Sequence, residues 1–170
     1  MTLAAAIFAA MASLPCPLDE PAEQCQPWRA TVAEAIAVAS GGSDVLAADL
    51  VEIGYHESGF RRRIQDGDCR LYRSGQSECD HYRGVFLARS MWQIHRTPEL
   101  PGVEALVSRK RWLAIQGTEP ASVTLAARTA ARVLAANPSA FGRAARTGKR
   151  ADASGRILAR IRAAKKGQPQ

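Results

Sequence analysis

The chain is predicted to form a single all-α domain, and three observations lead to this prediction. Its 170 residues suffice for one domain with a sizeable core, but hardly for two. Hydrophobic residues make up 46% and charged residues 23% of the chain, a globular composition that argues against disorder, collagen or coiled coil. Long runs rich in Ala, Leu, Val and Arg, with only 6% aromatic residues, favour helix over strand.

The first twelve residues are a short apolar stretch ending in Ala10-Met11-Ala12, the small-x-small pattern of a signal-peptidase site. The stretch lacks a basic n-region, so a signal-like segment over 1–12 and a first helix of the folded domain are both open interpretations. No segment approaches transmembrane length, and no transmembrane anchor is expected. We assign the single domain to residues 13–164, followed by a frayed basic tail at 165–170.

Four cysteines occur as two locally spaced pairs: Cys16 with Cys25, and Cys69 with Cys79. An even number with local spacing favours two disulfides over four reduced cysteines, and of the three connectivities we prefer this local pairing. Disulfides form in oxidising compartments, so they indicate an extracytoplasmic protein, periplasmic or secreted.

Two helices are predicted in the first third of the chain. The first runs from about Trp28 to Ser40, with Pro27 in its first turn and glycines after its end. The second runs from Asp44 to about Glu57. Helical spacing assigns a polar face to Asp49, Glu52 and His56, and an apolar face to Leu46, Leu50, Ile53 and Glu57.

The rest of the chain divides into a loop and further helices. Residues 58–89 are rich in Gly, Asp, Arg and Ser, which predicts a long loop or a small hairpin excursion, tied by Cys69–Cys79. Apolar periodicity predicts helices over about 103–115, 120–136, 139–147 and 153–164, with Gly148 between the last two.

Glu57 is the candidate catalytic residue, because it combines an apolar helix face with a helix C-terminus. Desolvation and the partial negative charge of the helix end both favour the protonated carboxyl group. Such a group can act as a general acid near neutral pH. The alternative is that Glu57 turns into solvent at the helix end, as charged residues usually do.

Two short motifs carry a family resemblance: Glu57-Ser58-Gly59-Phe60, and Ser90-Met91-Trp92-Gln93 beyond the loop. They resemble the lysozyme-like superfamily, in its soluble lytic transglycosylase and goose-type lysozyme branch. In that branch a Glu-Ser pair ends a buried helix and a Gly-Leu-Met-Gln-type segment follows across the cleft. Here Ser90 replaces the Gly. The resemblance covers residues 44–150 in helix order, but its specific part is about a dozen residues.

The resemblance implies a lysozyme-like cleft for peptidoglycan glycan strands, without a cofactor or a metal. The protein would be a lytic transglycosylase that cuts the β-1,4 bond between N-acetylmuramic acid and N-acetylglucosamine. Glu57 would protonate the departing oxygen and later act as base while the muramyl 6-hydroxyl closes a 1,6-anhydro ring. Ser58 would position Glu57 or the substrate. Substrate contacts would come from Tyr55, Ser58, Met91, Trp92 and Gln93, although Tyr55 and Trp92 fit a core role equally well.

The chain departs from the family near its C-terminus. The family usually shows an Ala-Tyr-Asn-x-Gly-type string on a late helix, whose Tyr reaches the catalytic Glu. The nearest string here is Ala144-Ala145-Arg146-Thr147-Gly148, which has no Tyr. Either Tyr82, Tyr72 or a water supplies this contact, or activity is altered or lost.

Two further functions stay open beside the transglycosylase. A lysozyme-type hydrolase would need a second carboxylate to activate water. The candidates are Asp66, Asp68 and Asp80, whose other explanation is turn formation. A non-catalytic peptidoglycan-binding module would keep the fold without turnover. A zincin site is excluded, because Phe60 stands where the second His of the motif belongs.

The net charge of +7 is unevenly distributed. Residues 1–60 hold one basic residue, Arg29, and eight acidic ones, whereas residues 61–170 hold 22 basic and eight acidic ones. A basic surface suits a polyanionic partner but does not specify it. Arg61-Arg62-Arg63 fits a nucleic-acid patch or contacts to muropeptide carboxylates, and the basic residues after position 155 fit a solvated helix face. We expect no nucleic acid, and leave cell-envelope assembly partners and the oligomeric state open.

Overall fold

The structure of the chain is a computed structural model that describes residues 1–70, 78–79, 81–82, 85–86, 88–95, 109–136, 141 and 148–167. It is all-α, as predicted. The helices are α1 (Leu3–Ala12), α2 (Ala22–Ser40), α3 (Asp44–Ser58), α4 (Arg62–Asp66), α6 (Arg109–Ala114), α7 (Pro120–Ala136) and α8 (Gly148–Lys165). Two antiparallel pairs of short strands accompany them, β1 (His81–Tyr82) with β2 (Val85–Phe86) and β3 (Ala88–Arg89) with β4 (Ile94–His95).

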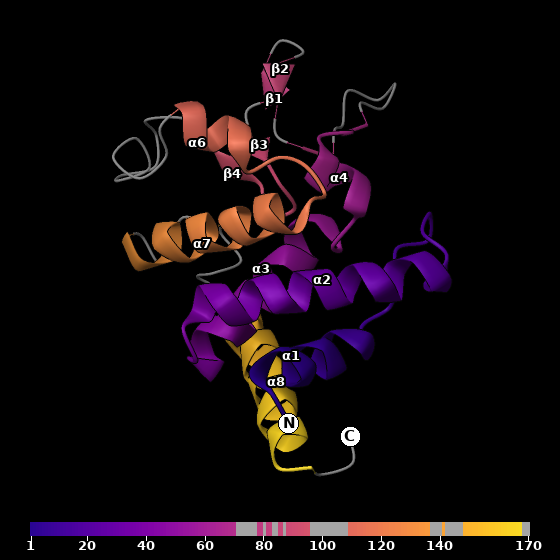
Figure 1. Cartoon of the computed structure of the whole chain (residues 1–170), viewed down its shortest axis with the longest axis vertical. Coiled ribbons are helices and arrows are strands. Elements are labelled where there is room, and N and C mark those ends of the chain that lie inside the picture. The colour runs from indigo at the N-terminus through magenta and orange to yellow at the C-terminus, as the bar shows by residue number, and fades with distance from the viewer. Residues whose placement is uncertain are drawn as a thin grey trace.

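The long helices form layers around one core. Helix α2 packs between α7 and α1, while α8 packs across α1 and α3 at one end of the molecule (Figure 1). Helices α4 and α6 and the strands lie at the opposite end (Figure 1). Helix α3 therefore runs through the middle, in contact with both α2 and α8.

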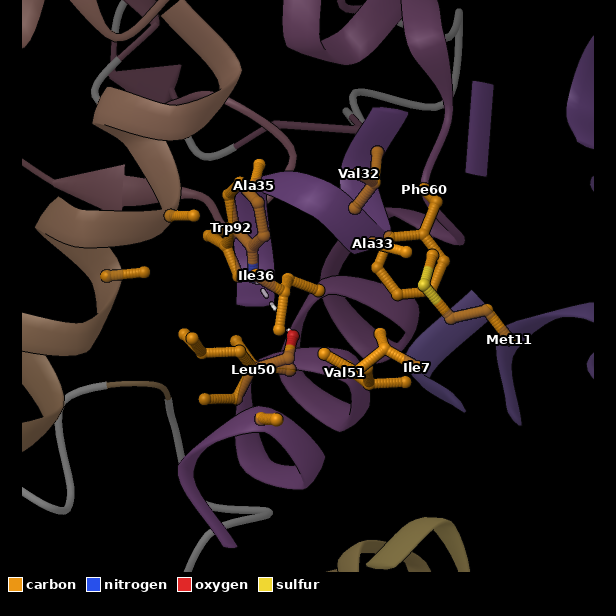
Figure 2. Packing of buried hydrophobic residues seen from close by; sticks show 14 of the residues in the cluster. Ile7, Met11, Val32, Ala33, Ala35, Ile36, Leu50, Val51, Phe60 and Trp92 are labelled. Carbon is orange, nitrogen blue, oxygen red and sulfur yellow. Dashed lines mark hydrogen bonds between the residues drawn. The ribbon is translucent and has the colours of Figure 1, made fainter. Parts of the chain in front are cut away.

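The core joins side chains from the N-terminal helices to a tryptophan far along the chain. Ile7 of α1, Ile36 of α2 and Leu50 of α3 have no exposed surface, nor does Trp92. Figure 2 shows the Trp92 indole above Leu50, where its Nε1 donates to the Leu50 carbonyl oxygen at 3.0 Å. The β3–β4 hairpin is thereby fastened to α3.

Residues 3–12 form a helix that contributes to this core. Ile7 and Met11 are completely buried. The buried Arg29 of α2 donates from Nη1 to the carbonyl oxygens of Met11 at 2.8 Å and Leu14 at 2.7 Å, and from Nη2 to that of Pro15 at 2.7 Å. These bonds supply donors to carbonyl groups at and just after the end of α1, where the Met11 carbonyl also accepts from the Leu14 amide at 3.0 Å. Burial lowers the pKa of the Arg29 guanidinium from its ordinary value.

Helix α2 begins earlier than predicted, at Ala22 and not at Trp28. Pro27 therefore lies inside the helix and not in its first turn. Pro21 precedes the first turn, and its carbonyl accepts from the amides of Gln24 and Cys25, each at 2.9 Å. The Cys25 side chain, in the part of α2 that precedes Pro27, is buried and forms the disulfide with Cys16.

Helix α3 has nearly the predicted bounds, but its predicted polar face is only partly exposed to solvent. Glu52 is buried, with only 6% of its surface exposed, because α8 packs on this side. Ser154 of α8 donates to Asp49 Oδ1 at 2.6 Å, and Lys165 Nζ lies 2.9 Å from Asp44 Oδ1. The predicted polar face is thus partly covered by α8, which buries Glu52, while His56 on the same face stays 58% exposed.

The other predicted helices agree with the structure in part, and some lie outside the described residues. Helix α7 has the predicted bounds. Helix α8 begins at Gly148, which was placed between two helices, and extends through residue 165. The region after α3 contains α4 and the strand pairs. Of the predicted helix over 103–115 the described part is α6, and the predicted helix over 139–147 lies outside the described residues except for position 141.

Both disulfides have the predicted pairing. Cys16–Cys25 joins Cα atoms 6.1 Å apart, and Cys69–Cys79 joins Cα atoms 5.8 Å apart, both ordinary separations for this bond. Two disulfides are typical of proteins that fold in an oxidising compartment. In the described part of the chain, no helix has both the length and the apolar character needed to cross a bilayer.

Replacing Gly54 with alanine is expected to destabilise the protein by about 1–3 kcal/mol. A Cβ atom there would lie 2.5 Å from Phe60 Cε1 and 3.1 Å from Trp92 Nε1, both in buried side chains. Gly155→Ala is the matched control, because its Cβ would meet nothing within 4 Å and alanine favours helix by about 1 kcal/mol. Urea denaturation measures both variants; equal effects would contradict the packing of Phe60 and Trp92 on α3.

Candidate functional site

Glu57 lies in the last turn of α3. Its side chain is 25% exposed, so it is largely shielded but still accessible from solvent. Nδ1 of the neighbouring His56 lies 3.8 Å from Glu57 Oε1, and the His56 side chain is 58% exposed. A carboxyl group at a helix C-terminus experiences the partial negative charge of the unpaired carbonyls. Glu57 thus lies at a helix C-terminus, where the sequence placed it.

The residues after Glu57 fix the end of the helix. Ser58 is buried, and its Oγ donates to the Gly54 carbonyl oxygen at 3.0 Å and accepts from the Phe60 amide at 3.1 Å. Gly59 has φ +62° and Phe60 has φ +60°, which reverses the chain direction. The Ser58 hydroxyl therefore links the last turn of α3, which carries Glu57, to the residues that follow it.

The second motif is the turn of the β3–β4 hairpin. Ser90 has φ +65° and Gln93 has φ +48°, a conformation that disfavours residues with a side chain. The Gln93 amide donates to the Ser90 carbonyl oxygen at 3.0 Å, and the Trp92 amide to Ser90 Oγ at 3.3 Å. Ser90 occupies the position where the resembling family has Gly, and its left-handed backbone is the one that glycine adopts most easily.

The two motifs contact each other although they are far apart in the sequence. Trp92 is hydrogen-bonded to Leu50 and packs beside Gly54 of α3. Met91 is also completely buried, and its amide donates to Gln65 Oε1 at 3.2 Å. The turn is therefore held between α3 and α4, on the helix that ends at Glu57.

Gln65 organises this region and was not singled out from the sequence. It is completely buried, and its Nε2 donates to the carbonyl oxygens of Ile115 at 2.8 Å and Gly117 at 3.0 Å, while its Oε1 accepts from Met91. One side chain thus joins α4, the hairpin turn and the end of α6. A glutamine in a loop-like stretch gives no sequence signal for such a role.

Replacing Gln65 with leucine is expected to lower the free energy of unfolding by about 2–3 kcal/mol, because it leaves buried backbone groups unpaired. Gln65→Glu is the informative second variant, since it keeps the acceptor for the Met91 amide and loses both donors. Denaturant unfolding monitored by tryptophan fluorescence gives the values. A loss below about 0.5 kcal/mol, the range of ordinary surface changes, would show that Gln65 does not fasten the turn.

Gln93 has an unusual combination of burial and missing contacts. Its side chain Nε2 lies 3.3 Å from Cys79 Sγ, whereas Oε1 is buried without a hydrogen-bond partner among the described residues. The residue as a whole is only 7% exposed. An unpaired buried acceptor is unfavourable by about 1–3 kcal/mol, which a donor on a ligand would relieve.

The other predicted site residues are distributed as follows. Met91 and Trp92 have no exposed surface, so they support the site from beneath. Tyr55 is half-buried, and its ring centroid lies 6.2 Å from that of Phe60. Asp66 and Asp68 are exposed at and just after the end of α4. Asp80 and Tyr72 lie outside the described residues, as do 144–147, and Tyr82 lies in β1.

The basic triplet after α3 is largely engaged in ion pairs. Arg61 Nε lies 3.1 Å from Asp19 Oδ1, and Arg63 Nη2 lies 3.2 Å from Asp19 Oδ2. Arg63 also pairs with Glu78, which raises the pKa of this guanidinium above its ordinary value. Arg62 lies over the Trp28 ring, 5.9 Å from its centroid. The triplet ties α4 to both disulfide-closed loops.

No three His, Cys, Asp or Glu side chains in the described ranges are arranged to hold a metal ion. Comparison of the sequence with protein-family models gave no match, and comparison with curated proteins and with solved structures gave no significant match either.

Proposed function

We propose that this protein is a lytic transglycosylase that cleaves the β-1,4 bond between N-acetylmuramic acid and N-acetylglucosamine in peptidoglycan. The observation that carries the proposal is the packing of the Ser90–Gln93 turn against α3, the helix that ends at Glu57. Two motifs that resemble one enzyme family are thus both attached to α3, the helix whose last turn carries the partly shielded Glu57 carboxyl group.

Glu57 supplies both proton transfers. Its carboxyl proton moves to O4 of the departing N-acetylglucosamine as the bond from that oxygen to C1 of the muramyl residue breaks. The resulting carboxylate then accepts the proton of the muramyl 6-hydroxyl, while O6 bonds to C1 and closes the 1,6-anhydro ring. Atoms and charges balance without water or a cofactor, and the 25% exposure of Glu57 allows a substrate to reach it.

A single carboxyl group suffices for this reaction, whereas an inverting hydrolase needs a second one some 6.5–9.5 Å away, on the order of two water diameters. Asp66 borders a separate surface hollow together with Asp19, Glu20 and Arg63. Asp68 is exposed, and its carbonyl oxygen accepts from Arg63 at 2.9 Å. Their setting favours a role in α4 and its turn, and the third candidate, Asp80, lies outside the described residues.

Gln93 and Ser58 have supporting roles in this proposal. Gln93 holds the second motif in place from a buried position, with its Nε2 3.3 Å from Cys79 Sγ. Ser58 holds the last turn of α3, so it fixes the direction in which Glu57 leaves the helix. The two disulfides agree with a site of action outside the cytoplasm, where peptidoglycan and envelope partners are found.

Incubation of the purified, disulfide-bonded protein with insoluble peptidoglycan tests the proposal. We expect steady release of soluble fragments, measured by absorbance of the supernatant after sedimentation. Sedimentation of the protein with the peptidoglycan, without any release of fragments, would replace the enzyme with the binding module.

A further inference from the structure

A cavity of about 460 Å³ lies between α3 and α8, outside the site described above. Its lining residues are Leu14, Glu52, Tyr55, His56, Ala153, Arg156, Ile157 and Arg160. We propose that this cavity binds the carboxylate-bearing peptide that branches from muramic acid in peptidoglycan. This assignment rests on the proposed function, because it names a second part of the same substrate.

The basic wall of the cavity is arranged for a carboxylate. Arg156 and Arg160 are one helical turn apart on α8, so their side chains emerge on the same face, and His56 of α3 lines the cavity with them. Arg160 Nη1 donates to Ser13 Oγ, which holds this guanidinium in place. A guanidinium has five N–H donors, so one bond to Ser13 leaves a pair for bidentate contact with a carboxylate.

The other lining residues favour a peptide over a phosphate. Glu52 is buried beside the cavity, and its carboxylate disfavours a phosphate dianion more than a ligand that carries ammonium and amide groups beside its carboxylates. Leu14, Ile157 and the Tyr55 ring add apolar surface. A ligand that fits carries an anionic group, amide or ammonium donors and small aliphatic groups, as this peptide does.

The cavity lies beside Glu57 but on another side of α3. Successive helical residues are about 100° apart, so Glu52, Tyr55 and His56 share one side and Glu57 faces away from it. His56 joins the two places, because it lines the cavity and its Nδ1 lies 3.8 Å from Glu57 Oε1. A peptide held by α8 would thus fix the attached glycan next to the end of α3. Its contribution should appear in KM more than in kcat.

The basic triplet is the competing place for such a contact, and its geometry is less suitable. Arg61 and Arg63 already pair with Asp19, and Arg63 also pairs with Glu78. A carboxylate ligand there would have to displace these ion pairs. Arg156 and Arg160, by contrast, border an open cavity.

Isothermal titration with the free tetrapeptide L-Ala-γ-D-Glu-meso-diaminopimelate-D-Ala tests the assignment. We expect the wild type to bind it and the double variant Arg156→Gln/Arg160→Gln to bind at least tenfold more weakly. The matched control is Arg128→Gln/Arg132→Gln, which removes two exposed arginines with the same spacing from α7 and should bind normally. Arg156→Gln alone serves as a second variant, because Arg156 is exposed and its loss leaves the packing intact.

The outcomes separate this assignment from the proposed function. Equal binding by the wild type and the α8 double variant, or no binding by either, would overturn the peptide site even if peptidoglycan fragments are released normally. If the peptide binds through the α8 arginines but the protein releases no fragments, the peptide site is supported and the proposed transglycosylase activity is overturned. Inorganic phosphate at the peptide concentration should not displace the peptide; full displacement would show a general anion site and overturn the peptide assignment.

Discussion

Replacing Glu57 with glutamine is expected to reduce the release of soluble peptidoglycan fragments by about a hundredfold to ten-thousandfold, the usual contribution of a general acid. Glutamine keeps the shape of the side chain and its place in the last turn of α3, but it has no proton to give to the glycosidic oxygen and cannot later accept one from the muramyl 6-hydroxyl. Initial rates of fragment release, at equal concentrations of folded protein, provide the measurement.

Glu34→Gln is the control for this substitution. Glu34 is exposed on α2, a helix that carries no site residue, so the same chemical change there should leave the rate unaltered. Both variants should unfold at the wild-type temperature. A Glu57→Gln protein that retains more than about a tenth of the wild-type rate would show that this carboxyl group is not the acid, since a tenfold effect corresponds to only about 1.4 kcal/mol.

Replacing Arg29 with methionine is expected to lower the free energy of unfolding by about 2–4 kcal/mol, because a buried carbonyl group left without a donor costs about 1–3 kcal/mol. The guanidinium makes three hydrogen bonds to carbonyl oxygens of Met11, Leu14 and Pro15. Methionine fills similar volume but removes all three hydrogen bonds, after which the Met11 carbonyl keeps its backbone bond from the Leu14 amide while the Leu14 and Pro15 carbonyls lose their Arg29 donor. Urea denaturation followed by circular dichroism measures the loss.

Arg29→Lys separates charge from geometry. Lysine keeps the positive charge but not the planar fork that reaches carbonyl groups on both sides, so we expect a smaller loss than for methionine. If Arg29→Met unfolded at the wild-type urea concentration, α1 would not depend on Arg29 for its attachment to α2.

Local sequence signals predicted the helices whose ends carry clear capping residues. Ser43 accepts from the Leu46 amide as an N-cap, and Gly59 ends α3 in a left-handed conformation, so the bounds of this helix followed from those two residues. Both disulfides followed from local cysteine spacing. These features depend on interactions between residues close in sequence, which is why a sequence reveals them.

Features that depend on distant residues could not be predicted in this way. Glu52 looks like a solvent-facing residue by helical period, and its burial follows from the packing of α8, more than ninety residues later in the chain. The role of Gln65 likewise depends on carbonyl groups of Ile115 and Gly117. The sequence assigned Arg160 to a solvated helix face, whereas in the structure it lines a cavity together with residues of α3.

The sequence singled out the residues of the candidate site, but it could not predict which of them are buried and which are exposed. Glu57, Ser58 and the turn ending in Gln93 were singled out from two short motifs, and the structure brings both motifs to α3. Burial divides them by position: Met91 and Trp92 are completely buried under the turn, whereas Glu57 is 25% exposed. A motif gives the order of residues along the chain, and only packing decides which side chains a substrate can contact.

Mass spectrometry of the soluble products from purified peptidoglycan, with wild type and Glu57→Gln compared side by side, tests the central claim most directly. The claim predicts fragments with 1,6-anhydromuramyl ends from the wild type, because ring closure uses the muramyl 6-hydroxyl, and their loss in the variant. Fragments with reducing ends would contradict it and assign a hydrolase. Anhydro-ended fragments released equally by both proteins would contradict it too, since Glu57 could then not be the group that moves the proton.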